Sequence, residues 1–327
     1  MAAVANSRFS SQSRGNRMKV LILGAGAIGG YLGGRLTDAG LDVTLLVRPA
    51  RKAQLDADGL QIRSVYGDLN IRVKTVTADE VTTPYDIVIV TAKAYDLESA
   101  IAAITPAVGP DTMVLPILNG IGHINTLNAA FGPKRILAGT VQISALRMPD
   151  GSIEHKNDWR WLRFGEQEGG LSDRVIALRD ALAAAEGLEP VALENAMQGM
   201  WEKFVHLATG AGMTCLMRAN AGQIVRSDEG AELFQHFLET TAEVARRSGY
   251  PPSDTFMANY RKLFADPHSG YATSMLRDVE AGNQTEGEDI LGLLLSTARE
   301  HGIDEPLFKA AYASIRAHEE RRQDGGL

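Results

Sequence analysis

A short glycine-rich segment that follows an apolar run has the spacing of a phosphate-binding turn. Residues 20–23 are typical of a buried parallel strand, Gly24, Gly26 and Gly29 follow as G-x-G-x-x-G, and a helix is expected from about Ala27. In such a turn the first glycine permits the tight bend, the second lets a pyrophosphate approach the backbone, and the third lets the helix pack on the strand. The helix N-terminus then holds the phosphates. The expected cofactor-binding residues of this loop are Gly24, Ala25, Gly26, Ala27, Ile28 and Gly29.

The elements around these glycines strengthen the prediction, since the triplet alone is a weak signal. A second apolar strand over residues 42–47 follows at the expected distance, so the loop lies in a strand–loop–helix–strand unit. This context favours a dinucleotide site. The alternative is a glycine-rich turn in another kind of α/β unit.

The end of the second strand indicates which dinucleotide is bound. An NAD site places Asp or Glu there to accept a hydrogen bond from the ribose 2′-hydroxyl. This chain instead has Arg48, followed by Arg51 and Lys52, and Asp42 lies too early to serve. A guanidinium pairs with phosphate through two hydrogen bonds, whereas a carboxylate would repel it. We therefore expect NADPH, with Arg48 as the main contact to the 2′-phosphate; the alternative is that the three cations form only a solvated loop.

Strands and helices alternate along the first half of the chain, which predicts a doubly wound parallel sheet and the α/β fold class. Gly59 is expected to end the helix that follows the second strand, and Gly67 lies in the turn of a small antiparallel pair. Strands are expected at residues 20–23, 42–47, 86–91, 113–118 and 136–141, helices up to residue 54 and over 97–107, and the antiparallel pair at 60–64 and 69–75.

The pattern changes after about residue 170, where apolar residues recur at helical spacing almost to the end of the chain. We expect a disordered extension over residues 1–17, a cofactor-binding domain over 18–192 and an all-α domain over 193–327 that carries substrate and catalytic residues. In open α/β sheets ligands bind at the carboxyl ends of the strands, so substrate and cofactor should meet in the cleft between the domains.

Composition narrows the classes of function. Hydrophobic residues make up 45% of the 327 residues and charged residues 22%, which is ordinary for a globular protein. The net charge of −7 gives no attraction to nucleic acid or to an anionic membrane. Cys215 is the one cysteine, no apolar run is long enough to span a membrane, and residues 1–17 lack the apolar core of a secretory signal. We expect a cytoplasmic protein without a metal site; the oligomeric state is open, with a homodimer as one expectation.

Four further segments, each with a polar residue that could act in chemistry, accompany the glycine loop. They are Thr91–Asp96 with Lys93, Leu115–Gly122 with Asn119, Trp201–Val205 with Lys203, and Thr273–Asp278 followed by Gln284–Glu286. In combination they make the chain resemble the ketopantoate reductase family (2-dehydropantoate 2-reductases) from Met18 to about residue 315. The resemblance implies a Rossmann domain followed by a helical domain similar to that of 6-phosphogluconate dehydrogenases. It also implies reduction of 2-dehydropantoate to (R)-pantoate with NADPH, on the pathway to pantothenate and coenzyme A.

The resemblance implies a role for each of these residues. Lys203 matches the general acid that protonates the carbonyl oxygen as hydride arrives, and it also contacts the substrate; desolvation in the cleft would lower its pKa. Glu286 matches the acidic partner that holds the substrate hydroxyl or the lysine, close to the cofactor. Asn119 matches the residue that touches nicotinamide and substrate together. Ser274 matches a contact to the substrate carboxylate, and Lys93 a contact to the cofactor.

Structural explanations stand beside these roles. Lys203 could be an ordinary surface lysine on a helix. Thr285 as N-cap and Glu288 three residues later would form a capping box that opens a helix over residues 290–300, which leaves Glu286 as the carboxylate for chemistry. His206 lies one helical turn from Lys203 and is an alternative proton donor, although a packed histidine is the commoner case.

The chain departs from the family pattern at two positions. The family has asparagines four and eight residues after the lysine, and these contact polar groups of the substrate, whereas this chain has Leu207 and Ala211. Losing a hydrogen-bond partner in a buried site costs about 1–3 kcal/mol. Three functions therefore remain open: reduction of 2-dehydropantoate, reduction of another, more apolar 2-oxo acid on the same fold, and a non-catalytic NADP(H)-binding sensor.

Overall fold

A five-stranded parallel sheet organises the N-terminal half of the protein. The computed structural model describes residues 18–326, so the extension expected at residues 1–17 lies outside the described residues. All neighbouring strands of this sheet are parallel, which confirms the doubly wound sheet. In spatial order the strands are β5 (Lys74–Val76), β2 (Asp42–Leu46), β1 (Lys19–Leu23), β6 (Ile87–Val90) and β7 (Met113–Pro116).

Helices cover both faces of this sheet, and for that reason its strands are apolar without alternation. Val20 and Ile22 of β1 pack in the same core as α1, whereas Leu21 between them packs in the core that contains α3 and α4. All four residues of β6 are fully buried. The helices of this half are α1 (Ala27–Asp38), α2 (Pro49–Asp58), α3 (Leu97–Ile104), α4 (His123–Phe131) and α5 (Asp173–Leu182).

A second, mixed sheet packs against α1 from the side opposite to the parallel sheet, and it corrects two of the expected strands. The strand expected at residues 136–141 lies here and not in the parallel sheet, and the strand expected at residues 69–75 is split between the two sheets. Residues 69–71 pair antiparallel with the expected partner strand at residues 60–62, whereas residues 74–76 form the edge strand β5 of the parallel sheet. The second sheet contains, in order, β10 (Glu189–Ala192), β9 (Ile153–Gly165), β3 (Leu60–Arg63) and β4 (Leu69–Ile71), with β8 (Ala138–Arg147) also paired to β9.

The structure shows why β8 leaves the parallel sheet and pairs with β9. Ile136 still forms an isolated parallel bridge with Val114 of β7, but the chain then crosses the end of β7. A Cβ on Gly139 would lie 2.7 Å from the carbonyl oxygen of Pro116, so only glycine permits this close crossing. An apolar run predicts that a strand exists but not which strand it pairs with, and β8 pairs with β9 along most of its length.

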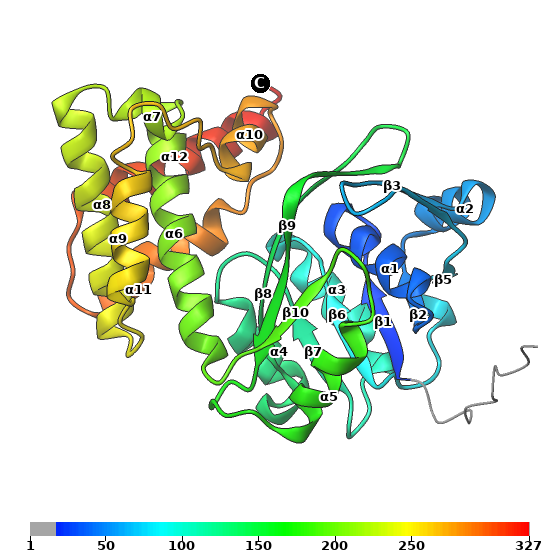
Figure 1. Ribbon diagram of the computed structural model, residues 1–327. Helices are drawn as coiled ribbons and strands as arrows, with labels where there is room; N and C mark the ends of the chain where they lie inside the picture. The colour runs from blue at the N-terminus through cyan, green and yellow to red at the C-terminus, as the bar shows by residue number, and fades with distance from the viewer. Residues whose placement is uncertain (1–17, 327) are drawn as a thin grey trace, which may run out of the picture.

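The C-terminal part is a helical domain that lies beside the β8–β9 hairpin, with α6 nearest to it (Figure 1). Asn195, Ser227 and Ser253 cap the first turns of α6, α8 and α9 by accepting hydrogen bonds from backbone N–H groups. No helix within residues 18–326 combines the length and apolarity needed to cross a membrane. The helices are α6 (Ala196–Met217), α7 (Ala221–Ile224), α8 (Asp228–Arg247), α9 (Asp254–Leu263), α10 (Ser274–Glu280), α11 (Leu293–Glu300) and α12 (Pro306–Gln323).

Candidate active site

The glycine loop between β1 and α1 contains two glycines that the fold itself requires, Gly24 and Gly29, and one that it does not, Gly26. A Cβ on Gly29 would lie 2.3 Å from the carbonyl oxygen of Gly24 and 2.5 Å from Oγ1 of Thr91, so the expected close packing is present. Gly24 has φ +98°, which only glycine adopts readily. Gly26 is exposed, and a Cβ there would meet no protein atom within 4 Å. The space above Gly26 therefore fits a group from outside the chain, as a pyrophosphate at this helix N-terminus would be.

Of the three cations after β2, Arg48 is the one whose side chain is available to a ligand. Its side chain is 81% exposed and makes one ion pair, 3.1 Å from Asp96. Exposed pairs of this kind contribute about 0–1 kcal/mol, so a phosphate can displace Asp96. Arg51 instead donates hydrogen bonds to the carbonyl oxygens of Ala25 and Gly151 and to Gln54, and Lys52 pairs with Asp56.

A buried carboxylate gathers residues from three distant segments. Glu286 is 5% exposed and accepts hydrogen bonds from Nζ of Lys93 at 3.2 Å and Nδ2 of Asn119 at 3.1 Å, through Oε2, and from the backbone N–H of Ala94 at 3.3 Å, through Oε1. Lys93 follows β6 and Asn119 follows β7, so both lie at the carboxyl ends of parallel strands. Burial lowers the pKa of Lys93, but the charges of Glu286 and Asp278 outweigh it and the pKa is raised. The structure thus joins these residues across the two domains.

Lys203 is not an ordinary surface lysine. It is half-buried on α6, and its Nζ donates to the carbonyl oxygen of Val141 on β8 at 3.3 Å. Desolvation lowers its pKa to about 8, although the negative charge of Glu286 acts in the opposite direction. Among the described residues it has no hydrogen bond to Glu286. An ammonium group with this pKa is charged near neutral pH and can still release its proton.

Two neutral histidines lie near Lys203. Nε2 of His206 is 2.7 Å from the hydroxyl of Tyr271, and its ring stacks on Tyr260. Desolvation, and next the charge of Lys203, lowers the pKa of His206 to about 3 and that of His123 to about 4. His206 is therefore a packed, neutral histidine and not the alternative proton donor. His123, the first residue of α4, was not singled out from sequence, and its buried Nε2 has no hydrogen-bond partner within residues 18–326.

Ser274 borders this cluster without joining it. It is the exposed first residue of α10. Asp278, one helical turn later, lies 3.8 Å from Lys93. Within the described part of the chain, Ser274 has no hydrogen bond to Lys203, Asn119 or Glu286. Because it is exposed, its hydroxyl is accessible to a ligand.

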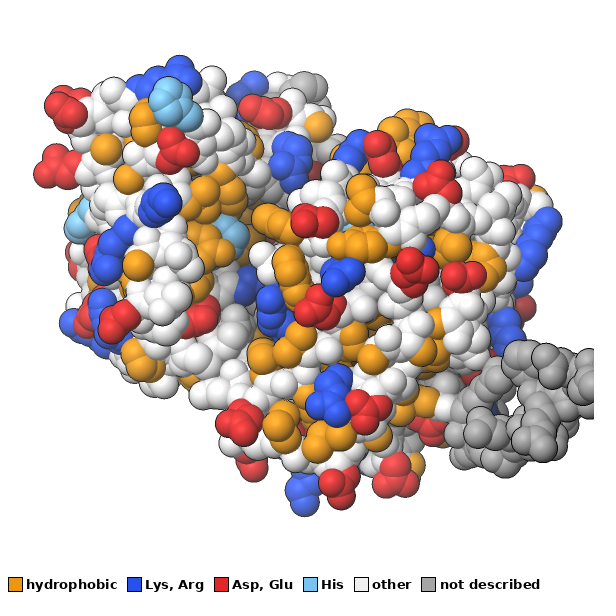
Figure 2. All heavy atoms as spheres, in the orientation of Figure 1, with side chains coloured by type: hydrophobic (Ala, Val, Ile, Leu, Met, Phe, Trp, Pro, Cys, Tyr) orange, Lys and Arg blue, Asp and Glu red, His pale blue; other side chains and the backbone are white. Residues whose placement is uncertain are grey.

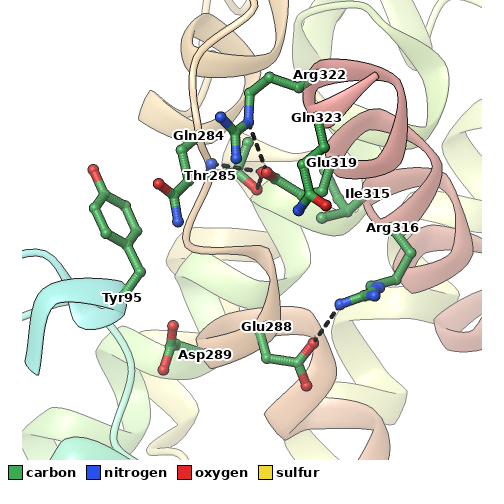
Figure 3. Close-up of a pocket in the computed structure, with 10 residues that line it drawn as sticks. All are labelled: Tyr95, Gln284, Thr285, Glu288, Asp289, Ile315, Arg316, Glu319, Arg322 and Gln323. Atoms are coloured by element: carbon green, nitrogen blue, oxygen red, sulfur yellow. Dashed lines mark hydrogen bonds and ion pairs between the residues drawn. The ribbon is translucent and has the colours of Figure 1, made fainter. Parts of the chain in front are cut away.

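The segment around Glu286 is held by α12 and not by the expected capping box. Glu319 accepts hydrogen bonds from both N–H and Oγ1 of Thr285, each at 2.8 Å. Glu288 bonds to the hydroxyl of Tyr312, and the helix opens with a π-helical turn, η5 (Glu288–Gly292), without a side-chain cap. A contact from α12 thus replaces the local capping interaction between Thr285 and Glu288. Figure 3 shows the Thr285–Glu319 contact at a cavity of about 150 Å³. Two arginines of α12 also form ion pairs there, Arg316 with Glu288 and Arg322 with Glu319.

Comparison with known proteins agrees with this arrangement. The sequence models described as ketopantoate reductase PanE/ApbA and ketopantoate reductase PanE/ApbA C terminal match residues 20–169 and 195–319. The chain belongs to the ketopantoate reductase family. An uncharacterized oxidoreductase of Bacillus subtilis, YkpB, is 32% identical over 92% of this chain and 99% of its own. The 2-dehydropantoate 2-reductase of Halobacterium salinarum is 26% identical over 91% of this chain and 98% of its own.

Solved structures of this family share the fold. The crystal structure of 2-dehydropantoate 2-reductase from Methylococcus capsulatus has a TM-score of 0.82 and 29% identity, and it covers 93% of this chain and 98% of its own. A D-mandelate dehydrogenase with NADH and anilino(oxo)acetate has a TM-score of 0.81 at 23% identity, which shows the fold alone. The chain is an oxidoreductase of the ketopantoate reductase type that acts on CH–OH donors.

Proposed function

We propose that the protein reduces a 2-oxo acid with NADPH, and that 2-dehydropantoate, reduced to (R)-pantoate for pantothenate and coenzyme A synthesis, is the first candidate substrate. The observation that carries the proposal is the half-buried ammonium of Lys203, with a pKa of about 8, next to the buried Glu286 cluster at the strand ends. Curated relatives that match over nearly the whole chain are named 2-dehydropantoate 2-reductase.

In this proposal each residue acts on a defined group. When bound, NADPH would supply the hydride that reduces the carbonyl carbon. Lys203 donates a proton to the carbonyl oxygen, where negative charge develops. Neither histidine is a proton source near neutral pH, because the pKa values of His206 and His123 are about 3 and about 4. Asn119, held by Glu286, presents its amide to nicotinamide and substrate without adding a charge. Ser274 would add a neutral hydrogen bond to the substrate.

The cofactor preference follows from the same kind of argument. Arg48 would exchange its exposed pair with Asp96 for the 2′-phosphate of NADPH, and Gly26 would leave room for the pyrophosphate. Lys93 would contact the cofactor at the closing edge of the cleft, where it already reaches Glu286 of the other domain. We assign cofactor binding to residues 18–192 and substrate binding and proton donation mainly to residues 193–327.

One observation favours a second substrate, a 2-oxo acid with an apolar substituent. Leu207 lies one turn after Lys203 on the same side of α6, is half-buried, and belongs to none of the hydrophobic clusters of the described residues. Its apolar side chain therefore lies outside the helical core on the face of α6 that carries Lys203. Apolar side chains also gather at the groove between the two lobes (Figure 2). Ala211, the other departure from the family pattern, is buried in the helical core.

A matched pair of substrates tests both possibilities. Trimethylpyruvate differs from 2-dehydropantoate only by lacking the hydroxyl group. Purified protein with NADPH should oxidise the cofactor with at least one of them. A kcat/KM higher for 2-dehydropantoate supports the first candidate, and a preference for trimethylpyruvate that Leu207→Asn reverses by roughly tenfold or more supports the second. NADPH binding without turnover of any 2-oxo acid would refute both and favour a sensor.

A further inference from the structure

We propose that Arg163 binds the carboxylate of the substrate, a role that rests on the proposed reduction of a 2-oxo acid. Arg163 is a half-buried residue of β9. Its guanidinium donates one hydrogen bond among the described residues, from Nη1 to Oε1 of Gln142 at 2.9 Å, and it lies over the ring of Trp161 at 5.3 Å. No carboxylate within residues 18–326 forms an ion pair with it. Most of its donors are thus available to a ligand.

The strand register places Arg163 beside the residue that holds Lys203. Arg163 is paired with Thr140 on β8, and the next residue, Val141, accepts the hydrogen bond from Lys203. Leu162 and Phe164, on either side of Arg163, are fully buried in the core behind the sheet. Because successive side chains of a strand point to opposite faces, the guanidinium points away from that core.

The opposite face is the one turned towards the helical domain. The charge of Arg163 acts on the hydroxyl of Tyr260 on α9, opposing the rise in pKa that burial produces there. Tyr260 stacks on His206, which lies one turn from Lys203 on α6. Arg163 therefore lies on the side of the β8–β9 hairpin that faces the helical domain.

The chemistry of a 2-oxo acid fits two cations with separate tasks. Its carboxylate is bonded directly to the carbonyl carbon, so the two groups can reach neighbouring cations at once. A guanidinium binds a carboxylate through two parallel hydrogen bonds and keeps its charge throughout. If Lys203 had to neutralise the carboxylate as well, its pKa would rise and proton donation would become harder. With Arg163 as the counter-ion, Lys203 retains a low pKa while substrate is bound.

The experiment compares Arg163→Gln with Arg160→Gln in the full-length protein. Arg160 is a matched control, since it lies on the same strand but pairs with Glu189 and covers Tyr66. Arg163→Gln should raise KM for the 2-oxo acid roughly 10- to 100-fold, as expected for loss of a charged hydrogen-bonded pair. Its kcat should change much less, and KM for NADPH should stay within twofold. Arg160→Gln should behave like the wild type, and Arg163→Lys should recover part of the affinity.

A neutral ligand separates charge recognition from a structural effect. The carboxamide of the same 2-oxo acid, used as an inhibitor, should bind wild type and Arg163→Gln equally. An equal loss for acid and amide, or an unchanged KM for the acid, would overturn the role of Arg163. Calorimetric binding of the acid to the NADP⁺-loaded protein gives the remaining distinction. If the acid binds in an Arg163-dependent way but is not turned over, the proposed reduction is refuted, whereas the role of Arg163 in binding the carboxylate stands. If the acid neither binds nor is turned over, both proposals are refuted.

Discussion

Lys203 should set the upper pH limit of the reaction. Desolvation lowers its pKa from 10.5 to about 8, and a proton donor acts only in its charged form. With this pKa, roughly 90% of the molecules carry the ammonium at pH 7 and roughly 10% at pH 9. We therefore expect kcat/KM to be constant below about pH 7 and to fall about tenfold for each pH unit above about pH 8.

Steady-state oxidation of NADPH between pH 6 and pH 10, at saturating cofactor, measures this fall in kcat/KM, the alkaline limb of the pH profile. Lys203→Arg keeps the positive charge but cannot release a proton in this range, so it should lose at least about 100-fold in kcat and show no limb near pH 8. Glu286→Gln removes the carboxylate whose charge raises the pKa of Lys203, so its midpoint should lie below that of the wild type.

Two results would refute this reasoning. One is a kcat/KM that stays level up to pH 10. The other is an unchanged limb in the residual activity of Lys203→Arg, which would assign the titration to another group. The buried histidines cannot imitate the limb, because the pKa values of His123 and His206 are lowered to about 4 and about 3.

Three further predictions follow from the same structure. Since the folded-state pKa of Lys203 lies below its ordinary value, the charged lysine costs stability below pH 8, and this cost disappears as the pH rises towards 10.5. Lys203→Met should therefore raise the free energy of unfolding at neutral pH by up to about 3 kcal/mol, because the pKa is shifted by about 2.5 units (10.5 − 8). An unchanged denaturation midpoint of this variant would contradict the desolvation of Lys203. Gly26→Ala should keep the wild-type Tm but lose most of its affinity for NADPH, whereas Gly29→Ala should lower the Tm, because only at Gly29 does the new Cβ meet protein atoms. Arg48→Glu should raise KM for NADPH far more than KM for NADH, and equal effects in the two titrations would remove Arg48 from the 2′-phosphate.

The parts of the site that sequence predicts are those fixed by local geometry. The glycine spacing defines the loop after β1. The carboxyl ends of parallel strands share one edge of the sheet, so the sequence predicts that Lys93 and Asn119 lie near each other. Their contacts with Glu286 span 193 residues in one case and 167 in the other. The family resemblance placed Glu286 in the same site but predicted that it would hold the substrate hydroxyl or Lys203. No local pattern encodes a contact of that kind.

The errors have a common physical origin in tertiary partners. The run at residues 136–141 forms a strand, but it pairs with β9, because Gly139 lets it cross the end of β7. Thr285 has the sequence of an N-cap, but Glu319 from α12 takes both of its donors. Arg163 carried no signal at all, since an arginine in a polar-looking strand is unremarkable until the strand beside it is seen to hold Lys203.

The placement of Glu286 explains why Lys203 can have a low pKa in a cleft that contains carboxylates. Had Glu286 accepted a hydrogen bond from Lys203, the pair would have raised the pKa of the lysine and held its proton. Instead Glu286 is occupied by Lys93, Asn119 and the backbone of Ala94, and Lys203 is left with a carbonyl oxygen. Lys93 therefore contributes to proton donation by keeping the carboxylate away from the donor. By the same argument Lys93→Met, which removes one of the two hydrogen bonds to Oε2 of Glu286 and the positive charge beside it, should raise the pH midpoint of the activity above that of the wild type.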